Sequence, residues 1–253
     1  MSAFSLAIVI WGLGLEVVIL ARALATRMTA KFPIFYSYIA FVLACEIVVG
    51  SVLHFYPAHY TTDYWFYFVA RTLAEFGVLF EVSDSVFKPY PTVRNLGRLL
   101  IILTCIVFAL WYGLPMEWSR EPSWVRFLEL IKISAVTKAI AIAALLGFAR
   151  SYRIPVGRNA GGILLGFAAY LAAQASTFGA ALYFGRAIYA PVLSWLGPVG
   201  FGICLSVWTV ALWKPDSVAI LQPAAGDIAG EAAYRPEIQL RRFSTFVTRF
   251  LSK

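Results

Sequence analysis

The sequence predicts an all-α membrane protein, a polytopic bundle of seven transmembrane helices with its N-terminus outside and its C-terminus in the cytoplasm. The chain of 253 residues is 61% hydrophobic and only 13% charged, with a mean hydropathy of +0.78. A soluble domain of this length needs a far more charged surface. Seven apolar runs approach or reach the length of about 20 residues that a helix needs to cross a bilayer. Basic residues also gather in alternate connections, which is typical of membrane proteins.

The seven runs follow one another along the chain, separated by short connections that are polar or contain Pro or Gly. They are predicted at residues 4–24, 33–54, 64–87, 99–113, 124–148, 161–184 and 191–213. The first run contains Ala21-Arg22-Ala23, which resembles a signal-peptide cleavage site, but no basic residue precedes its apolar stretch. We therefore expect it to remain uncleaved. Together the runs form a transmembrane domain at residues 1–213.

Most of the 21 basic residues lie in connections that would share one side of the membrane. They are Arg22, Arg27, Lys31, Lys88, Arg94, Arg98, Arg150, Arg153, Arg158, Lys214, Arg235, Arg241, Arg242, Arg249 and Lys253. The other connections carry only Arg120 and Arg186, and Arg126 begins the fifth run. Because cytoplasmic connections collect Lys and Arg, the pattern predicts an N-terminus outside. It also supports the count of seven, since a missed run would place basic connections on both sides.

The chain changes character after the last run. Residues 214–235 mix Ala, Gly and Pro without periodicity, which predicts a flexible cytoplasmic linker. Residues 236–253 predict a basic amphipathic helix that lies on anionic lipids of the inner leaflet. Its apolar side chains recur at helical spacing, and they are Phe243, Val247, Phe250 and Leu251. The alternative is that this helix binds a partner protein. The net charge of +8 does not indicate a nucleic-acid partner, because the basic residues gather in the connections that would share one side of a membrane.

Ionisable groups inside the predicted spans are the candidate functional residues. A charge near the bilayer centre costs on the order of 3 kcal/mol, so such groups need partners or water. Counting about 1.5 Å per residue places four of them at comparable depths near the midplane. They are Glu16, Glu46, Glu75 and Lys138. Arg71, one helical turn before Glu75, and Lys132 lie at a similar level, so we predict a polar cluster that faces the bundle interior.

This cluster has two interpretations. It binds a small ligand, an ion or a proton, or it consists of fixed ion pairs that only specify which helices pack together. The predicted ligand-binding or ion-binding residues are Glu16, Glu46, Arg71, Glu75, Lys132, Lys138 and, from the sixth run, Gln174. Glu81 and Asp84 lie toward the cytoplasmic end, where an interfacial ion pair with Lys88, four residues after Asp84, accounts for them.

The sixth and seventh runs carry small residues and helix-breaking residues. Gly162 and Gly166 have GxxxG spacing, which predicts close contact with another helix. Gln174 is expected either to form a hydrogen bond across that contact or to turn into the polar cluster. In the seventh run, Pro198 lies among glycines and predicts a kink or an unwound turn. Broken helices of this kind line the substrate sites of some transporters.

These observations favour a binding protein of receptor or sensor type in an inner or plasma membrane. A small molecule or proton would alter the midplane cluster, and a cytoplasmic or membrane partner protein would receive the change. The alternatives are a small proton-coupled secondary transporter and an accessory subunit of a membrane complex. The sequence contains no HExxH, GxSxG or Walker motif, so we expect neither catalysis nor a metal site. It assigns no cofactor.

Overall fold

The computed structural model describes residues 3–56, 60–113, 123–152, 154–184 and 196–214, and this part of the chain is all-helical. Its elements are α1 (Ala3–Thr26), the 3-10 turn η1 (Met28–Ala30), α2 (Pro33–Phe55), α3 (Tyr60–Phe87), α4 (Pro91–Gly113), α5 (Ser123–Ser151), α6 (Arg158–Phe184) and α8 (Leu196–Leu212). Each predicted run coincides with one of these helices. The predicted linker and amphipathic tail lie outside the described residues, apart from Lys214.

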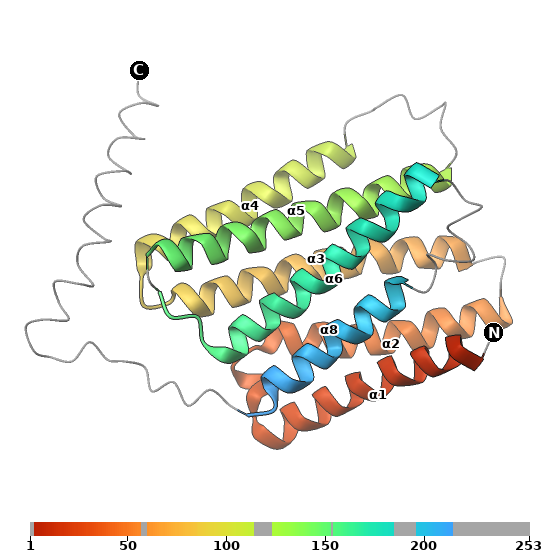
Figure 1. The fold of residues 1–253 in the computed structure, drawn as a ribbon, viewed down its shortest axis with the longest axis horizontal. Helices are drawn as coiled ribbons and strands as arrows, with labels where there is room; N and C mark the ends of the chain where they lie inside the picture. The colour runs from red at the N-terminus through yellow and green to blue at the C-terminus, as the bar shows by residue number, and fades with distance from the viewer. Residues whose placement is uncertain (1–2, 57–59, 114–122, 153, 185–195, 215–253) are drawn as a thin grey trace, which may run out of the picture.

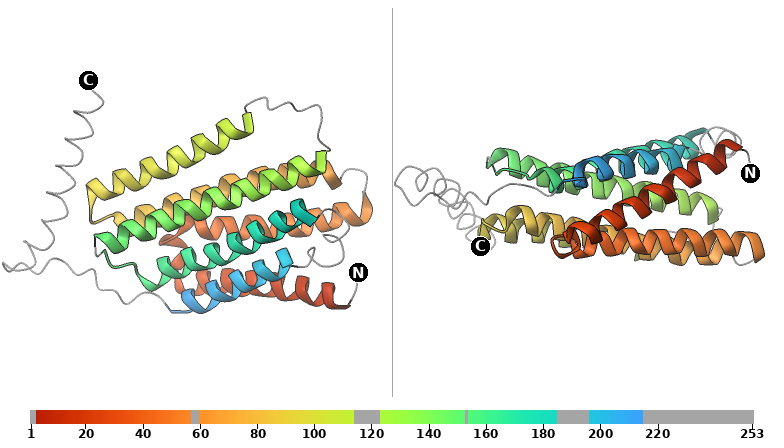
Figure 2. Two further views of the ribbon diagram at one scale, coloured as in Figure 1. Left: turned by 45° about the horizontal axis from the view of Figure 1, so that its top comes forward. Right: turned by 90° about the horizontal axis from the view of Figure 1, so that it is seen from below.

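The helices form a closed ring in chain order. Each helix packs against the next along the chain, and α8 returns to pack against α1. Consecutive helices alternate in direction (Figure 1). Figure 2 shows α2, α3 and α4 in one layer, α6 and α8 in the other, and α1 crossing between them. α3 contacts α5 and α6 as well as its chain neighbours α2 and α4, so it lies among these helices within the bundle.

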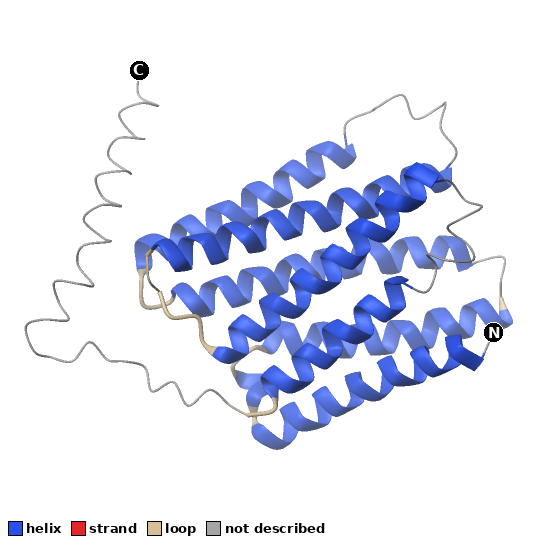
Figure 3. Ribbon diagram, in the orientation of Figure 1, coloured by secondary structure: helices blue, strands red, loops and turns tan. Residues whose placement is uncertain are grey.

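The described helices include several that are suited to a membrane. Four segments are long and apolar enough to cross one, namely Ala7–Thr26, Pro33–Val52, Leu128–Ser151 and Arg158–Phe184, and Leu196–Leu212 is a shorter apolar helix. The chain therefore has the helices of a membrane protein. The α3–α4 and α5–α6 connections lie at the same end of the bundle (Figure 3). Basic residues of the sequence are concentrated at this end.

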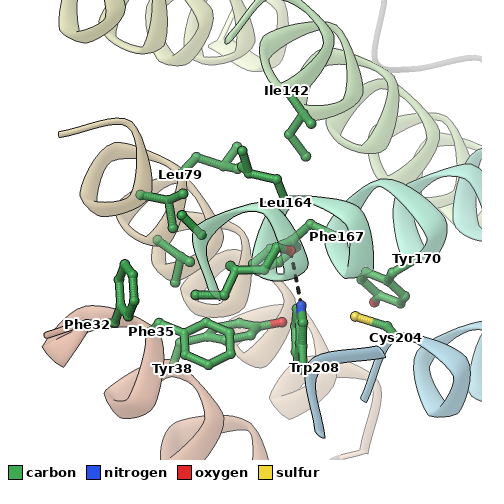
Figure 4. Close-up of a cluster of buried hydrophobic side chains, with 14 of the residues drawn as sticks. Phe32, Phe35, Tyr38, Leu79, Ile142, Leu164, Phe167, Tyr170, Cys204 and Trp208 are labelled. Carbon is green, nitrogen blue, oxygen red and sulfur yellow. Dashed lines mark hydrogen bonds between the residues drawn. The ribbon is translucent and has the colours of Figure 1, made fainter. Parts of the chain in front are cut away.

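The apolar core lies between the two layers and centres on Trp208 of α8 (Figure 4). Trp208 is completely buried, and its indole Nε1 donates a hydrogen bond to the carbonyl oxygen of Ile163 at 3.0 Å. Its ring packs edge-on against Phe35 and Phe167, with centroid distances of 5.0 and 4.9 Å. A Cβ atom on Gly166 would overlap the Trp208 ring. The close contact predicted for α6 is thus confirmed, with α8 as its partner.

One prediction about helix geometry is wrong. α4 begins at Pro91, earlier than residue 99, because its first turns are helical but polar and so give no hydropathy signal. Pro198 lies in the first turn of α8 (Leu196–Leu212), and the residues just before Leu196 lie outside the described part of the chain, so the predicted kink or unwound turn stays a prediction. Proline is tolerated in the first turn of a helix, where the backbone N–H has no partner within the helix.

Candidate functional site

Glu75 of α3 is the centre of a buried charge network. Its side chain is almost fully buried, yet both carboxylate oxygens have partners. Lys138 of α5 donates to Oε2, while Oε1 accepts hydrogen bonds from Arg71 Nε at 3.1 Å and from the Tyr38 hydroxyl at 3.2 Å. One carboxylate therefore joins α2, α3 and α5. Hydrogen bonds to charged groups are the stronger ones, at about 1.5–3 kcal/mol each.

Arg71 extends this network toward α6 and α8. Its Nη1 donates to the Tyr67 hydroxyl at 2.7 Å. The guanidinium carbon lies 4.7 Å from the ring centroid of Phe201 and 5.0 Å from that of Tyr170, which are cation–π distances. Gln174 donates to the Tyr170 hydroxyl at 2.5 Å. Of the two arrangements predicted for Gln174, the structure places it beside the polar cluster.

Glu16 of α1 differs from Glu75 in having no bonded partner. It is completely buried, and among the described residues neither of its carboxylate oxygens has a hydrogen-bond partner. Arg71 Nη2 is also buried and without a hydrogen bond in this part of the chain. Glu46 of α2 and Arg71 are the charged groups that interact electrostatically with Glu16. Arg71 therefore pairs with Glu75 and interacts electrostatically with Glu16 and Glu46.

Lys132 is not brought into this network. It lies on α5 and is partly buried, but no ion pair between described residues includes it. Lys138, on the same helix, is 2% exposed and reaches Glu75. No contact between described residues joins Lys132 to the polar cluster, so its predicted membership stays a prediction.

Two acidic groups connect α3 to its neighbours at the basic end of the bundle. Glu81 accepts hydrogen bonds from the backbone N–H groups of Ile34 and Phe35, each at 2.8 Å. These amides belong to the first turn of α2, where backbone donors have no partner within the helix and a negative charge is stabilising. Glu81 therefore holds the start of α2 against α3.

Asp84 pairs with α4 rather than with its own helix. Its carboxylate accepts hydrogen bonds from Arg94 at 2.5 Å and from Arg98 at 2.9 Å. The hydrogen bond to Asp84 raises the pKa of Arg94 above its ordinary value. The predicted pair of Asp84 with Lys88 is wrong, because the early start of α4 folds two arginines back over Asp84.

Arginines from two other helices bind the carbonyl groups that follow the C-terminus of α8. Arg22 of α1 donates from Nε and Nη2 to the carbonyl oxygen of Trp213, at 3.1 and 3.0 Å. Arg158 of α6 donates to the carbonyl oxygen of Lys214 at 2.5 Å. Positive charge is favourable at a helix C-terminus. The point at which the chain leaves the bundle is therefore fixed to α1 and α6.

Three tyrosines contact the charged residues of the network and were not predicted from the sequence. Tyr38, Tyr67 and Tyr170 are as apolar in pattern as their neighbours, so nothing marked their hydroxyl groups as partners of charged residues. The only signal available was the spacing of four residues between Tyr67 and Arg71, which puts both on one face of α3. No comparable signal exists for Tyr38, which reaches Glu75 from another helix.

The arrangement is one of buried ion pairs, hydrogen bonds and cation–π contacts. In the described part of the chain, no group of three or more His, Cys, Asp or Glu is placed to hold a metal ion. Comparisons with protein-family models, curated proteins and solved structures found no match to the chain. The function is therefore inferred from the geometry of the charge network.

Proposed function

We propose that the chain is a multi-pass protein of receptor or sensor type in an inner or plasma membrane, with seven spanning helices and its N-terminus outside. The shared basic end of the described connections supports this orientation. Among the described helices, α3 and α4 are not included in the four that are long and apolar enough to cross a membrane. However, Arg71 and Glu75 are bonded inside the bundle and Asp84 is paired at its basic end, so these charges need not face lipid.

The observation that carries the proposal is the bonding of Glu75. Its carboxylate holds α2 through Tyr38 and α5 through Lys138, so a proton or a competing ligand group at Glu75 would weaken both contacts at once. α3 then runs on to the basic end, where Glu81 caps α2 and Asp84 pairs with α4. A displacement of α3 would therefore be transmitted to the cytoplasmic face, where a partner protein would detect it.

Spin-label distances between the α1–α2 and α3–α4 connections test this proposal, with protons as the probe. Lys31 and Lys88 are both exposed, and each is replaced by a spin-labelled cysteine in a variant without the three native cysteines. The protein is placed in lipid nanodiscs, and the distance is measured from neutral to acidic pH. We expect the distance to shift in this parent protein and to stay constant after Glu75→Gln.

A matched control is Glu129→Gln, because Glu129 is an exposed glutamate of α5 outside the network. This control is expected to shift like the parent protein. A parent protein that does not shift, or a Glu75→Gln variant that shifts like the control, would contradict the sensor proposal. Proton flux into proteoliposomes that depends on Glu75 would instead establish a transporter, and an obligate co-purifying chain would establish an accessory subunit.

A further inference from the structure

The charges of the buried network do not balance when every group is ionised. Its acids are Glu16, Glu46 and Glu75, and its bases are Arg71 and Lys138. This leaves one negative charge in excess inside a bundle of apolar helices. Burying an uncompensated charge costs several kcal/mol, and a buried group is neutralised instead where its chemistry permits. One of the three carboxyl groups is therefore expected to hold a proton.

The bonding pattern shows which carboxyl group this is. Glu75 forms ion pairs with both Arg71 and Lys138, which stabilise its ionised form. Glu46 is only partly buried. Glu16 is completely buried and has no hydrogen bond to either oxygen from the described residues. With the helices in the described arrangement, an ionised carboxylate there would lose its solvation without a hydrogen bond from the described residues to replace it.

The elements around α1 favour the neutral form of Glu16. α2 contributes Glu46, whose like charge opposes ionisation, while the Tyr38 hydroxyl of α2 is bonded to Glu75. α8 has no charged residue between Leu196 and Leu212, and its sole titratable side chain is Cys204. η1 has no charged residue either.

Arg71 of α3 is the group that opposes this preference, because its positive charge favours ionised Glu16. Its Nε is bonded to Glu75 and its Nη1 to Tyr67, which holds the guanidinium group in place. Its remaining Nη2 is buried and has no hydrogen-bond acceptor among the described residues. Arg71 therefore retains one donor for a carboxylate other than Glu75.

We propose that Glu16 is a proton-binding site whose carboxylic acid makes the buried network electrically neutral. Release of the proton breaks the O–H bond and sends the proton to solvent. The carboxylate left on Glu16 then accepts a hydrogen bond from the free Nη2 of Arg71, which draws α1 toward α3. This inference deepens the proposed function and rests on it for the placement of α1 in the membrane.

Infrared spectroscopy of the protein in lipid nanodiscs tests the proposal near neutral pH. Exposed carboxyl groups are ionised under these conditions, since their pKa values are about 4. The C=O stretch of a protonated carboxylic acid then reports a buried acid. We expect this band in the wild-type protein and in Glu46→Gln, and its complete loss in Glu16→Gln. In Glu16→Asp, which keeps the acid, the band is expected to remain at a shifted frequency.

Absence of the band from the wild-type protein would overturn the proposal, and so would its loss in Glu46→Gln with retention in Glu16→Gln. If Glu16→Gln does not fold, as judged by its circular dichroism, the frequency shift in Glu16→Asp decides the assignment. The result is independent of the spin-label experiment. A band that depends on Glu16 without movement at the cytoplasmic end would keep the proton site and remove the sensor.

Discussion

Glu75 and Glu16 are two buried carboxyl groups of one helix bundle, but their surroundings are opposite. Glu75 accepts hydrogen bonds from three side chains on α2, α3 and α5. Glu16 lies on α1, where Trp11 packs against Gly202 of α8 and no hydrogen bond from the described residues reaches the carboxyl group. Burial alone therefore does not give the role of an acid in such a bundle. The hydrogen-bond partners of a buried carboxyl group determine whether its charged or its neutral form is the more stable one.

Glu75→Gln is expected to have the largest effect. It leaves Arg71 and Lys138 buried without their anion, and removing one partner of a buried ion pair costs about 3–5 kcal/mol. Reversible unfolding in mixed detergent micelles measures this loss. Glu129→Gln, the exposed control, should change the free energy of unfolding by no more than about 0.5 kcal/mol. Equal losses in the two variants would show that the bonds of Glu75 contribute nothing.

A double-mutant cycle of Glu75→Gln and Lys138→Gln sharpens the first prediction. The double variant has neither charge of the pair, so its loss of unfolding free energy should be smaller than the sum of the two single losses. Residues in direct contact show coupling energies of about 0.5–3 kcal/mol. Strict additivity in the same unfolding measurement would mean that the two charges do not interact.

Gly202→Ala tests the contact between α1, which carries Glu16, and α8. A Cβ atom at Gly202 would overlap the Trp11 ring, and overpacking costs about 1–3 kcal/mol. Gly14→Ala on α1 is the control, because open space surrounds that position. We expect the control to be neutral or stabilised by up to about 1 kcal/mol, the helix propensity of Ala over Gly. Similar stabilities of the two variants would show that α1 and α8 are not in tight contact.

Glu16→Gln is expected to have the smallest effect. It replaces a neutral acid by a neutral amide of nearly the same shape, and both leave a buried polar group without a partner. The free energy of unfolding should change by about 1 kcal/mol or less, since the desolvation cost is common to both side chains. A loss as large as that of Glu75→Gln would mean that Glu16 is ionised and paired.

Part of this site could be predicted from the sequence. The spacing of four residues put Arg71 and Glu75 on one face, and the depth of Lys138 placed it at the same level. Lys132 had an equally suitable depth, but it is six residues from Lys138, which is not a whole number of helical turns, so the two point to different sides of α5. The depth of a residue along a helix can be counted from the sequence. Which neighbouring helix its side chain reaches depends on how the helices pack, and the sequence pattern does not give that.

Helix ends and partners near them were less predictable. Hydropathy locates the apolar part of a helix, and the helical segment before residue 99 of α4 is polar. The prediction for Asp84 considered only Lys88, four residues further along the chain, because nothing in the sequence indicated that α4 begins at Pro91. The connection between α3 and α4 is short enough to bring Arg94 over Asp84 instead. Contacts across a turn depend on where the next helix begins, which periodicity does not fix.

The most direct test of the contrast between the two acids is solid-state NMR of the protein in lipid bilayers near neutral pH, with glutamate labelled at its carboxyl carbon. The signal that disappears in Glu75→Gln should have the shift of an ionised carboxylate and correlate with Lys138 Nζ. The signal that disappears in Glu16→Gln should have the shift of a protonated acid. Two ionised carboxylates, or a protonated Glu75, would contradict the account.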